Sequence, residues 1–424
     1  MPSNLDHVRS ARKDHLCFKT IKTHLTATFA LALATSVTTI AANASAPPAS
    51  AAGEQAQSAD SFVDSIGVNV HLRNTGGVYS KYNDIIKPRL QELGVRHIRD
   101  NSGKDAAFYQ KLNDLATIGI KSTLIVDVER YQPAEAVALA KAIPNSLVAV
   151  EGPNERDHFG GFSYKGLPWP ENLRSYQSDL YKAIKRDPAT ADIAVLHASL
   201  ATPRNVSAIG FSADSFDQGN IHYYHGVQPA FDLDAKVIPE LKKVTGGKPL
   251  VVTETGWSNV SQPVKAKYVP RLYLEHFNRG IARTFLYELH NQGTDPNPEH
   301  NFGILNFDGS PQPAFTALKN LISLVQDSGG NFTPGKLDYQ LSGQTTGVNH
   351  TLLQKSDGKF DLILWQDDEG ENNPDQQVTL TLNQPFSSAK TFLPLNSTEP
   401  TNSYSNPKSL DLRVPDHPLV VELD

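Results

Sequence analysis

Eight short apolar runs recur at fairly regular intervals along the first three-quarters of the chain. Their apolar positions are continuous rather than alternating, which is typical of strands buried on both faces of a parallel sheet. The runs cover residues 65–72, 95–100, 121–128, 146–155, 192–200, 219–226, 248–257 and 283–292. The pattern therefore predicts eight parallel strands.

Amphipathic stretches lie between these runs. Residues 82–93 and 106–118 place apolar side chains at helical spacing, and further helices are expected over residues 133–143 and 171–185. Repeated strand–helix alternation over about 250 residues predicts an α/β fold, a (β/α)8 TIM barrel spanning residues 61–330. A doubly wound open sheet is the rival, but no G-x-G-x-x-G fingerprint follows the first run.

The pattern changes from about residue 331. Helical periodicity stops, and turn residues separate short β-rich runs such as DLILWQ and VTLTL. These runs predict a small C-terminal antiparallel β-domain of sandwich-like form over residues 331–424. Residues 47–60 are rich in Pro, Ala, Ser and Gln, which predicts a linker before the barrel.

The N-terminal segment has the pattern of an export signal. Five basic residues precede an apolar run from Leu25 to Ala42, and both ANA (42–44) and ASA (44–46) fit an A-x-A cleavage site. We expect residues 1–46 to be a signal peptide and the mature protein to be secreted or periplasmic, free of the membrane. An uncleaved anchor is the alternative, disfavoured because Thr and Ser interrupt the run before about 20 apolar residues accumulate.

Composition excludes several classes of protein. The single cysteine, Cys17, lies in the predicted signal peptide, so the mature chain has no disulfide framework, thiol nucleophile or cysteine-built zinc site. The formal net charge is −6, and residues 1–46 carry five basic and two acidic side chains, so the mature body is more acidic still. That charge argues against nucleic acid as a partner. We expect a monomer without a cofactor.

Two glutamates stand where apolar runs meet Gly- or Pro-containing turns. Glu155 closes VEGPNE (150–155) on the fourth run, and Glu254 lies in VTETGW (252–257) on the seventh. Because parallel strands of a barrel end at one rim, we expect the two carboxylates to converge. Glycosidic bond cleavage needs such a pair, one to protonate the leaving oxygen and one ionised to attack or stabilise the sugar carbon.

The motifs GPNE and TETGW resemble those of the retaining glycoside hydrolases of clan A, such as families 39 and 5. The resemblance implies that Glu155 is the acid/base, Glu254 is the nucleophile, and Asn154 binds the sugar 2-hydroxyl. The trailing β-domain is similar to that of family 39. The chain departs from many members in having Arg156 after the acid/base.

The same resemblance implies a supporting set of residues around the nucleophile. Arg99 in VRHIRD, with His222 and Tyr224 in IHYYHG, would brace the nucleophile and hold it ionised. Many members place a Trp on the eighth strand as a sugar platform, whereas FLYELHNQ offers Tyr287, Glu288 and His290. That second departure leaves the sugar at the cleavage site open.

Other candidate residues have two interpretations each. Trp257 and Trp169 either stack on sugar rings or are packed aromatics. Glu288 either contacts substrate or pairs with an Arg. We expect His71 and Asn69, at the end of the first run, to line the site. No metal is expected, because His222 and His225 would face opposite sides of a strand end and no third ligand is evident nearby.

The sequence therefore predicts a secreted glycosidase that cleaves a poly- or oligosaccharide by a retaining double displacement. A transglycosylase on the same two glutamates is an alternative that sequence cannot separate from a hydrolase. A non-catalytic carbohydrate-binding barrel predicts loss of one glutamate, and a metal-dependent amidase predicts His/Asp clusters at several strand ends; neither feature is found. The sugar, its linkage and anomer, and endo or exo attack stay open.

Overall fold

A computed structural model describes residues 53–424, except 159–161, 203–204, 212, 226–232, 234–236, 328 and 331. The predicted signal peptide, and the alternative reading of its apolar run as a membrane anchor, lie outside the described residues. Among the helices that are described, none has the length and apolar character needed to cross a bilayer.

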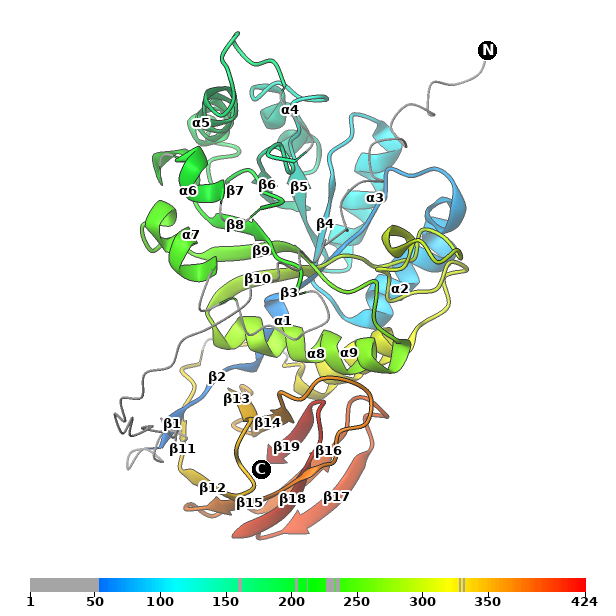
Figure 1. Ribbon diagram of the computed structural model, residues 1–424, viewed down its shortest axis with the longest axis vertical. Helices are drawn as coiled ribbons and strands as arrows, with labels where there is room; N and C mark the ends of the chain where they lie inside the picture. The colour runs from blue at the N-terminus through cyan, green and yellow to red at the C-terminus, as the bar shows by residue number, and fades with distance from the viewer. Residues whose placement is uncertain are drawn as a thin grey trace, which may run out of the picture. The chain divides into compact units, whose positions relative to one another are not determined.

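Eight parallel strands form the predicted barrel (Figure 1). They are β3 (Ile66–Asn69), β4 (His97–Asn101), β5 (Lys121–Ile125), β6 (Leu147–Glu151), β7 (Ala194–Leu196), β8 (Gly219–His222), β9 (Leu250–Thr255) and β10 (Ile281–Leu286). The order is β7-β6-β5-β4-β3-β10-β9-β8, and a bridge between Leu196 and Gln218 joins the two ends of the sheet. Each strand falls within or beside one of the eight apolar runs, so the TIM-barrel prediction is confirmed.

Helices follow the strands and cover the outside of the barrel (Figure 1). They are α1 (Ala59–Asp64), α2 (Lys87–Leu93), α3 (Ala106–Thr117), α4 (Glu135–Ala142), α5 (Glu171–Arg186), α6 (Asn205–Ile209), α7 (Ile238–Thr245), α8 (Gln262–Asn278) and α9 (Pro313–Val325), with short helical turns η1 (Gly77–Lys81), η2 (Tyr82–Ile86), η3 (Ala213–Ser215) and η5 (Pro298–His300). The Asp105 side chain caps α3 by accepting from Phe108 N, and Phe108, Leu112 and Leu115 are its buried face. Apolar side chains at helical spacing thus pack each helix onto the sheet.

The C-terminal residues form two facing β-sheets (Figure 1, yellow to red). Their strands are β2 (Gln57–Ser58), β12 (Tyr339–Gly343), β13 (Val348–Gln354), β14 (Phe360–Gln366), β15 (Gln376–Leu382), β16 (Ser388–Phe392), β17 (Pro400–Ser405), β18 (Ser409–Val414) and β19 (Leu419–Leu423), while β11 (Lys336–Leu337) pairs with β1 (Glu54–Gln55) in a separate two-stranded sheet. One sheet has the order β17-β16-β19-β14-β13-β2 and the other β12-β15-β18. Alternate residues such as Leu410, Leu412 and Val414 are buried in a shared core with Leu362 and Val421. The predicted antiparallel β-domain is confirmed.

The expected linker over residues 47–60 is wrong for its second half. β1 (Glu54–Gln55) pairs antiparallel with β11, and β2 (Gln57–Ser58) pairs parallel with β13. Helix α1 begins directly afterwards at Ala59. The polar side chains that suggested a linker stand on edge strands, where the backbone supplies the pairing and composition gives little sign of it.

Candidate active site

The two glutamate motifs lie at the same rim of the barrel, and each needs its glycine. Glu155 follows the end of β6 by four residues, and Glu254 is the fifth residue of β9. A Cβ on Gly152 would lie 2.8 Å from the backbone nitrogen of Ala198. A Cβ on Gly256, whose φ is +149°, would lie 2.4 Å from the carbonyl oxygen of Tyr287. Close backbone approach therefore explains why both turns contain glycine.

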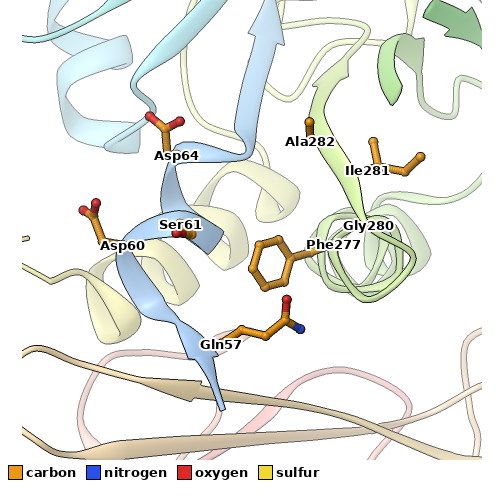
Figure 2. A pocket seen from close by; sticks show the side chains of 8 residues that line it. All are labelled: Gln57, Asp60, Ser61, Asp64, Phe277, Gly280, Ile281 and Ala282. Atoms are coloured by element: carbon orange, nitrogen blue, oxygen red, sulfur yellow. The ribbon is translucent and has the colours of Figure 1, made fainter. Parts of the chain in front are cut away.

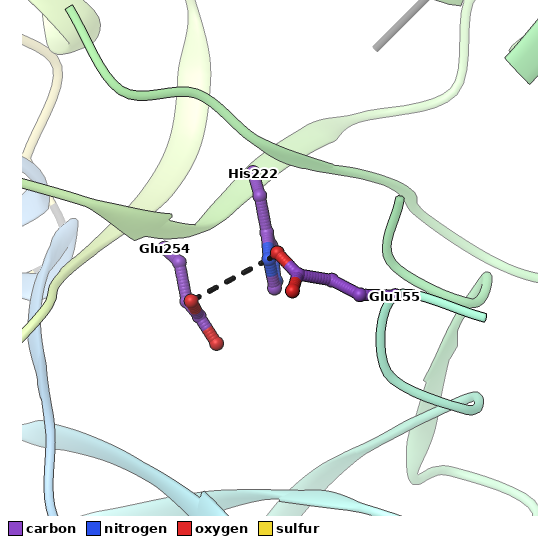
Figure 3. Close-up of side chains that lie close together, drawn as sticks. All are labelled: Glu155, His222 and Glu254. Carbon is purple, nitrogen blue, oxygen red and sulfur yellow. Dashed lines mark hydrogen bonds and ion pairs between the residues drawn. The ribbon is translucent and has the colours of Figure 1, made fainter. Parts of the chain in front are cut away.

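The carboxylates of Glu155 and Glu254 converge, as expected (Figure 3). One oxygen of each carboxylate and a ring nitrogen of His222 all lie within 4.8 Å of one another. Retaining glycosidases hold their two carboxyl groups about 5–5.5 Å apart, whereas inverting ones leave about 6.5–9.5 Å for a water molecule. The close pair is therefore suited to attack by one carboxylate and proton transfer by the other.

Arg99 on β4 forms hydrogen bonds to both glutamate motifs. Its Nε and Nη2 bond both oxygens of Glu151 at 2.6 and 2.7 Å, while Nη1 bonds Oε1 of Glu254 at 2.8 Å. Nη1 also bonds Oδ1 of Asn69 at 2.9 Å, so Asn69 holds the arginine rather than facing the opening. Glu151 was missed by the sequence analysis. The available signal was its place in VEGPNE, because a buried arginine requires a buried carboxylate nearby.

Tyr224 and Asn154 complete the contacts around the pair. The Tyr224 hydroxyl donates to Oε2 of Glu254 at 2.9 Å. Oδ1 of Asn154 accepts from Nη2 of Arg99 at 2.9 Å and from Oγ of Ser199 at 3.1 Å. The amide nitrogen of Asn154 has no hydrogen-bond partner in the described part of the chain, so a donor remains for a ligand.

His222 contacts a different glutamate from the one expected. Its Nδ1 lies 2.7 Å from Oε1 of Glu155 and 3.5 Å from Oε2 of Glu254. Burial alone would raise the pKa of Glu155, but the hydrogen bond and charge of His222, with the charge of Arg99, lower that pKa below its ordinary value. Burial opposes a charge on His222, yet Glu254 and Glu155 raise its pKa above the ordinary value. His222 is thus bonded to Glu155, the acid/base candidate, rather than to Glu254, the nucleophile candidate.

The same three side chains are spaced closely enough to hold a metal ion. The surrounding charges argue against that use. Nδ1 of His222 already bonds Glu155, and the guanidinium of Arg99 stands 2.8 Å from Glu254. A divalent cation would have to displace the first contact and lie beside the second positive charge. The donor set fits a hydrogen-bonded pair of carboxylates better than a metal centre.

His71 and Glu288 form a second polar pair at the rim. Nε2 of His71 lies 2.7 Å from Oε2 of Glu288, and Nε2 of Gln292 donates to Oε1 of Glu288 at 2.9 Å. Glu288 is 0% exposed and follows a cis peptide bond from Tyr287. Of the two alternatives for Glu288, pairing with an arginine is therefore wrong, because a histidine takes that place; contact with a substrate stays a prediction.

The two tryptophans do not join this cluster. Trp257 is only 2% exposed, and its ring packs on His225 at 5.9 Å and on Tyr268 at 5.4 Å. Its expected role as a sugar platform is wrong, because the core covers the ring, and the packed-aromatic alternative holds. Trp169 is 43% exposed, just before α5, with no contact to the two carboxylates among the described residues.

A separate hollow of about 400 Å³ lies at the other end of the strands (Figure 2). Ile281, where β10 begins, and Asp64, where α1 ends, are among its lining residues. Asp64 pairs with His97 and Arg283 at 2.8 and 2.7 Å, so its carboxylate is already neutralised. Barrel active sites lie at the carboxyl ends of the strands, which favours the glutamate rim over this hollow.

Comparison with known proteins supports the fold. No family model matches the sequence, and no curated protein does either. Solved structures do match. A family 39 glycoside hydrolase from Bacteroides cellulosilyticus has a TM-score of 0.56 and 19% identity, over 87% of this chain and 82% of that one. A glucosidase from Croceicoccus marinus has a TM-score of 0.58 and 10% identity, over 88% of this chain and 97% of that one.

These likenesses are likenesses of fold. The barrel with its C-terminal β-domain is shared with known glycoside hydrolases, and the expected similarity to family 39 is confirmed at that level. At such low identity the chemistry has to be argued from the rim itself.

Proposed function

We propose that the chain is a glycoside hydrolase that cleaves a poly- or oligosaccharide with retention of anomeric configuration. Glu254 is the nucleophile and Glu155 the acid/base in this proposal. The observation that carries it is the approach of the two carboxylates to within 4.8 Å at the carboxyl ends of the barrel strands. The similarity of the fold to a family 39 glycoside hydrolase supports the same reaction class.

The contacts of Glu254 suit a nucleophile. One oxygen accepts from the guanidinium of Arg99 and the other from the hydroxyl of Tyr224. Both donors stabilise the carboxylate anion. Both hydrogen bonds weaken when a carboxylate oxygen forms a bond to the sugar carbon, because the negative charge is then lost. The free amide nitrogen of Asn154 is placed to donate to a hydroxyl of the bound ring.

The contacts of Glu155 suit a group that exchanges a proton. The His222–Glu155 pair holds a proton between Nδ1 and Oε1, 2.7 Å apart. In the first step Glu254 attacks the sugar carbon, the glycosidic bond breaks, and the leaving oxygen takes the proton from Glu155. In the second step Glu155 removes a proton from water, whose oxygen displaces Glu254. A sugar hydroxyl in place of water gives transglycosylation.

Two substitutions test the proposal. Glu254→Ala is expected to lower kcat by several orders of magnitude, because the covalent step is lost. Glu155→Ala is expected to spare aryl glycosides with an activated leaving group, and azide should restore turnover by attacking the intermediate. The assay is a panel of polysaccharides and aryl glycosides, with the anomer of the first product read by NMR.

Glu240→Gln is a matched control, because Glu240 is on the outer helix α7, bonded to Lys243 and Ser207. It should turn over like the wild type. Near-wild-type turnover in Glu254→Ala, or an inverted product, would contradict the retaining assignment. Product analysis at low sugar concentration separates a hydrolase from a transglycosylase, since a transglycosylase still extends the sugar chain in competition with water, whereas a hydrolase then releases only shortened sugars.

We further propose that the protein is exported and acts after removal of residues 1–46. The basic start, the apolar run and the two A-x-A sites support export. N-terminal sequencing of the exported protein tests this proposal.

A further inference from the structure

His71 is held at the rim by one ring nitrogen only. Nε2 bonds Glu288, which is fully buried and held from the other side by Gln292. The His71 side chain itself is 20% exposed. Its other nitrogen, Nδ1, is neither buried nor hydrogen-bonded within the part of the chain that the structure describes. A fixed ring thus presents one unused polar atom.

The position of His71 places its ring near enough to Glu254 for the charge of that carboxylate to act on it. His71 follows Asn69 by two residues, and alternate residues of an extended segment face the same side. Asn69 bonds Arg99, which bonds Glu254, so His71 lies one step nearer the open end of the barrel on the same face. The ring of Tyr287 meets His71 edge-on at 6.0 Å, and Tyr79 meets it at 5.9 Å.

We propose that His71 is a specificity-determining residue that hydrogen-bonds a hydroxyl group of a neutral sugar through Nδ1, while Glu288 fixes the ring. This inference rests on the proposed function and narrows its substrate class. Just after the eighth strand, this chain has a buried carboxylate that orients a histidine. In this proposal the sugar ring is recognised at this position by a hydrogen bond.

A hydroxyl suits this nitrogen better than a carboxylate does. A hydroxyl can donate to a neutral imidazole or accept from an imidazolium, so it binds in either protonation state. Three carboxylates surround His71: Glu288 after β10, Asp100 on β4 and Glu254 on β9, and together they raise its pKa despite burial. Of the positive groups nearby, Arg99 is paired with Glu151, Lys265 donates to the carbonyls of Asn301 and Gly303, and the charge of Arg73 acts on Asp100. A uronate carboxylate would meet repulsion from Glu288 and Glu254, whereas burial raises the pKa of Asp100 to about 7 and so reduces its negative charge at neutral pH.

The test compares His71→Ala with wild type on 4-nitrophenyl glycosides of glucose, galactose, mannose, xylose and glucuronic acid, in both anomers. On the best neutral substrate, kcat/KM is expected to fall about 10- to 100-fold, the effect of losing one hydrogen bond in a desolvated site. Monodeoxy analogues of that substrate identify the hydroxyl. For one analogue the penalty of His71→Ala should nearly vanish, because the partner atom is already gone.

His71→Asn is expected to recover part of the loss, since the asparagine amide can replace Nδ1. His350→Asn is the matched control, because His350 forms a similar pair with Glu54 at 2.9 Å in the β-domain; its kcat/KM should be unchanged. An equal penalty on every deoxy analogue, or a wild type that prefers glucuronides, would overturn the inference alone. A wild type inactive on every glycoside and polysaccharide would overturn the proposed function as well.

Discussion

Glu155 has a backbone conformation that is uncommon for a residue with a side chain. Its φ is +48°, in the left-handed region, which costs a non-glycine residue roughly 1 kcal/mol. The surrounding contacts hold it there: Glu155 N donates to the carbonyl of Ser199 at 3.0 Å, and His222 bonds its carboxylate. The strain turns the side chain toward Glu254 just after β6 has ended, which is a functional reason for keeping it.

The His222–Glu155 pair predicts a pH dependence for the proposed enzyme. Because the pKa of His222 is raised above 6.5, the pair keeps its shared proton below that raised value and loses it as the pH rises through it. Activity that needs this proton is therefore present on the acid side and lost on the alkaline side. In His222→Asn the proton must sit on Glu155 alone, so we expect the alkaline limb of kcat/KM to move to lower pH.

The measurement is a pH profile of kcat/KM for wild type and His222→Asn on an unactivated glycoside. A dinitrophenyl glycoside is the control, because its leaving group needs no proton and the limb should be weak in both proteins. An alkaline limb that stays in place in His222→Asn would show that His222 does not share the proton.

At the scale of elements, helix α8 carries a stripe of buried charges toward the C-terminal strands. Lys267, Arg271 and Glu275 are spaced four residues apart, so they lie on one face. Lys267 pairs with Asp416 at 2.8 Å, and Arg271 donates to the carbonyls of Asp368 and Asp416 at 3.0 Å each. Glu275 accepts from the indole of Trp365 at 2.9 Å. This face of α8 thus contacts the β-domain through buried polar groups. Each of these groups needs its partner, because an unpaired charge in the interior is costly.

Removing one member of the buried pair should therefore be costly. Lys267→Met leaves Asp416 buried without its cation, and we expect a loss of about 3–5 kcal/mol in the free energy of unfolding, measured in urea. Lys267→Met with Asp416→Leu should recover most of the loss, since neither charge remains. The exposed Lys243→Met on α7 is the control and should be nearly silent. Equal stability of the single and double variants would argue against the pair.

At the scale of the whole molecule, the two short strands β1 and β2, which precede the barrel in the sequence, belong to the β-domain by their pairing. β1 and β2 pair with β11 and β13, although some 280 to 300 residues separate the partners in sequence. Gln55 adds side-chain bonds to the carbonyls of Pro334 and Gly335. The residues just before the barrel therefore pair with strands of the β-domain before the first barrel helix begins.

This arrangement limits where the proposed signal-peptide cleavage can fall. Cleavage after Ala44 or Ala46 leaves β1 and β2 intact, whereas cleavage beyond residue 58 would remove both strands. We expect mass spectrometry of the exported protein to find Ser45 or Pro47 at its N-terminus. A start beyond Ser58, or an uncleaved Met1 on a membrane-bound protein, would contradict the signal-peptide proposal.

The sequence by itself determined the class of fold and the two glutamates that converge at the rim of the barrel. Continuous apolar runs and helical spacing are local patterns, so they reveal β3 to β10 and the helices between them without knowledge of distant contacts. Glu155 and Glu254 were found for the same reason, because each stands where a buried run meets a turn.

Only the tertiary structure decided which side chain bonds which. His222 bonds Glu155 across 67 residues, Arg99 bonds Glu151 across 52, and His71 bonds Glu288 across 217. It also decided that Trp257 is covered and that residues 54–55 and 57–58 are strands. These contacts join residues far apart in sequence, and they form only when the barrel closes and the β-domain pairs with strands β1 and β2. A local sequence pattern does not show which distant residues will meet.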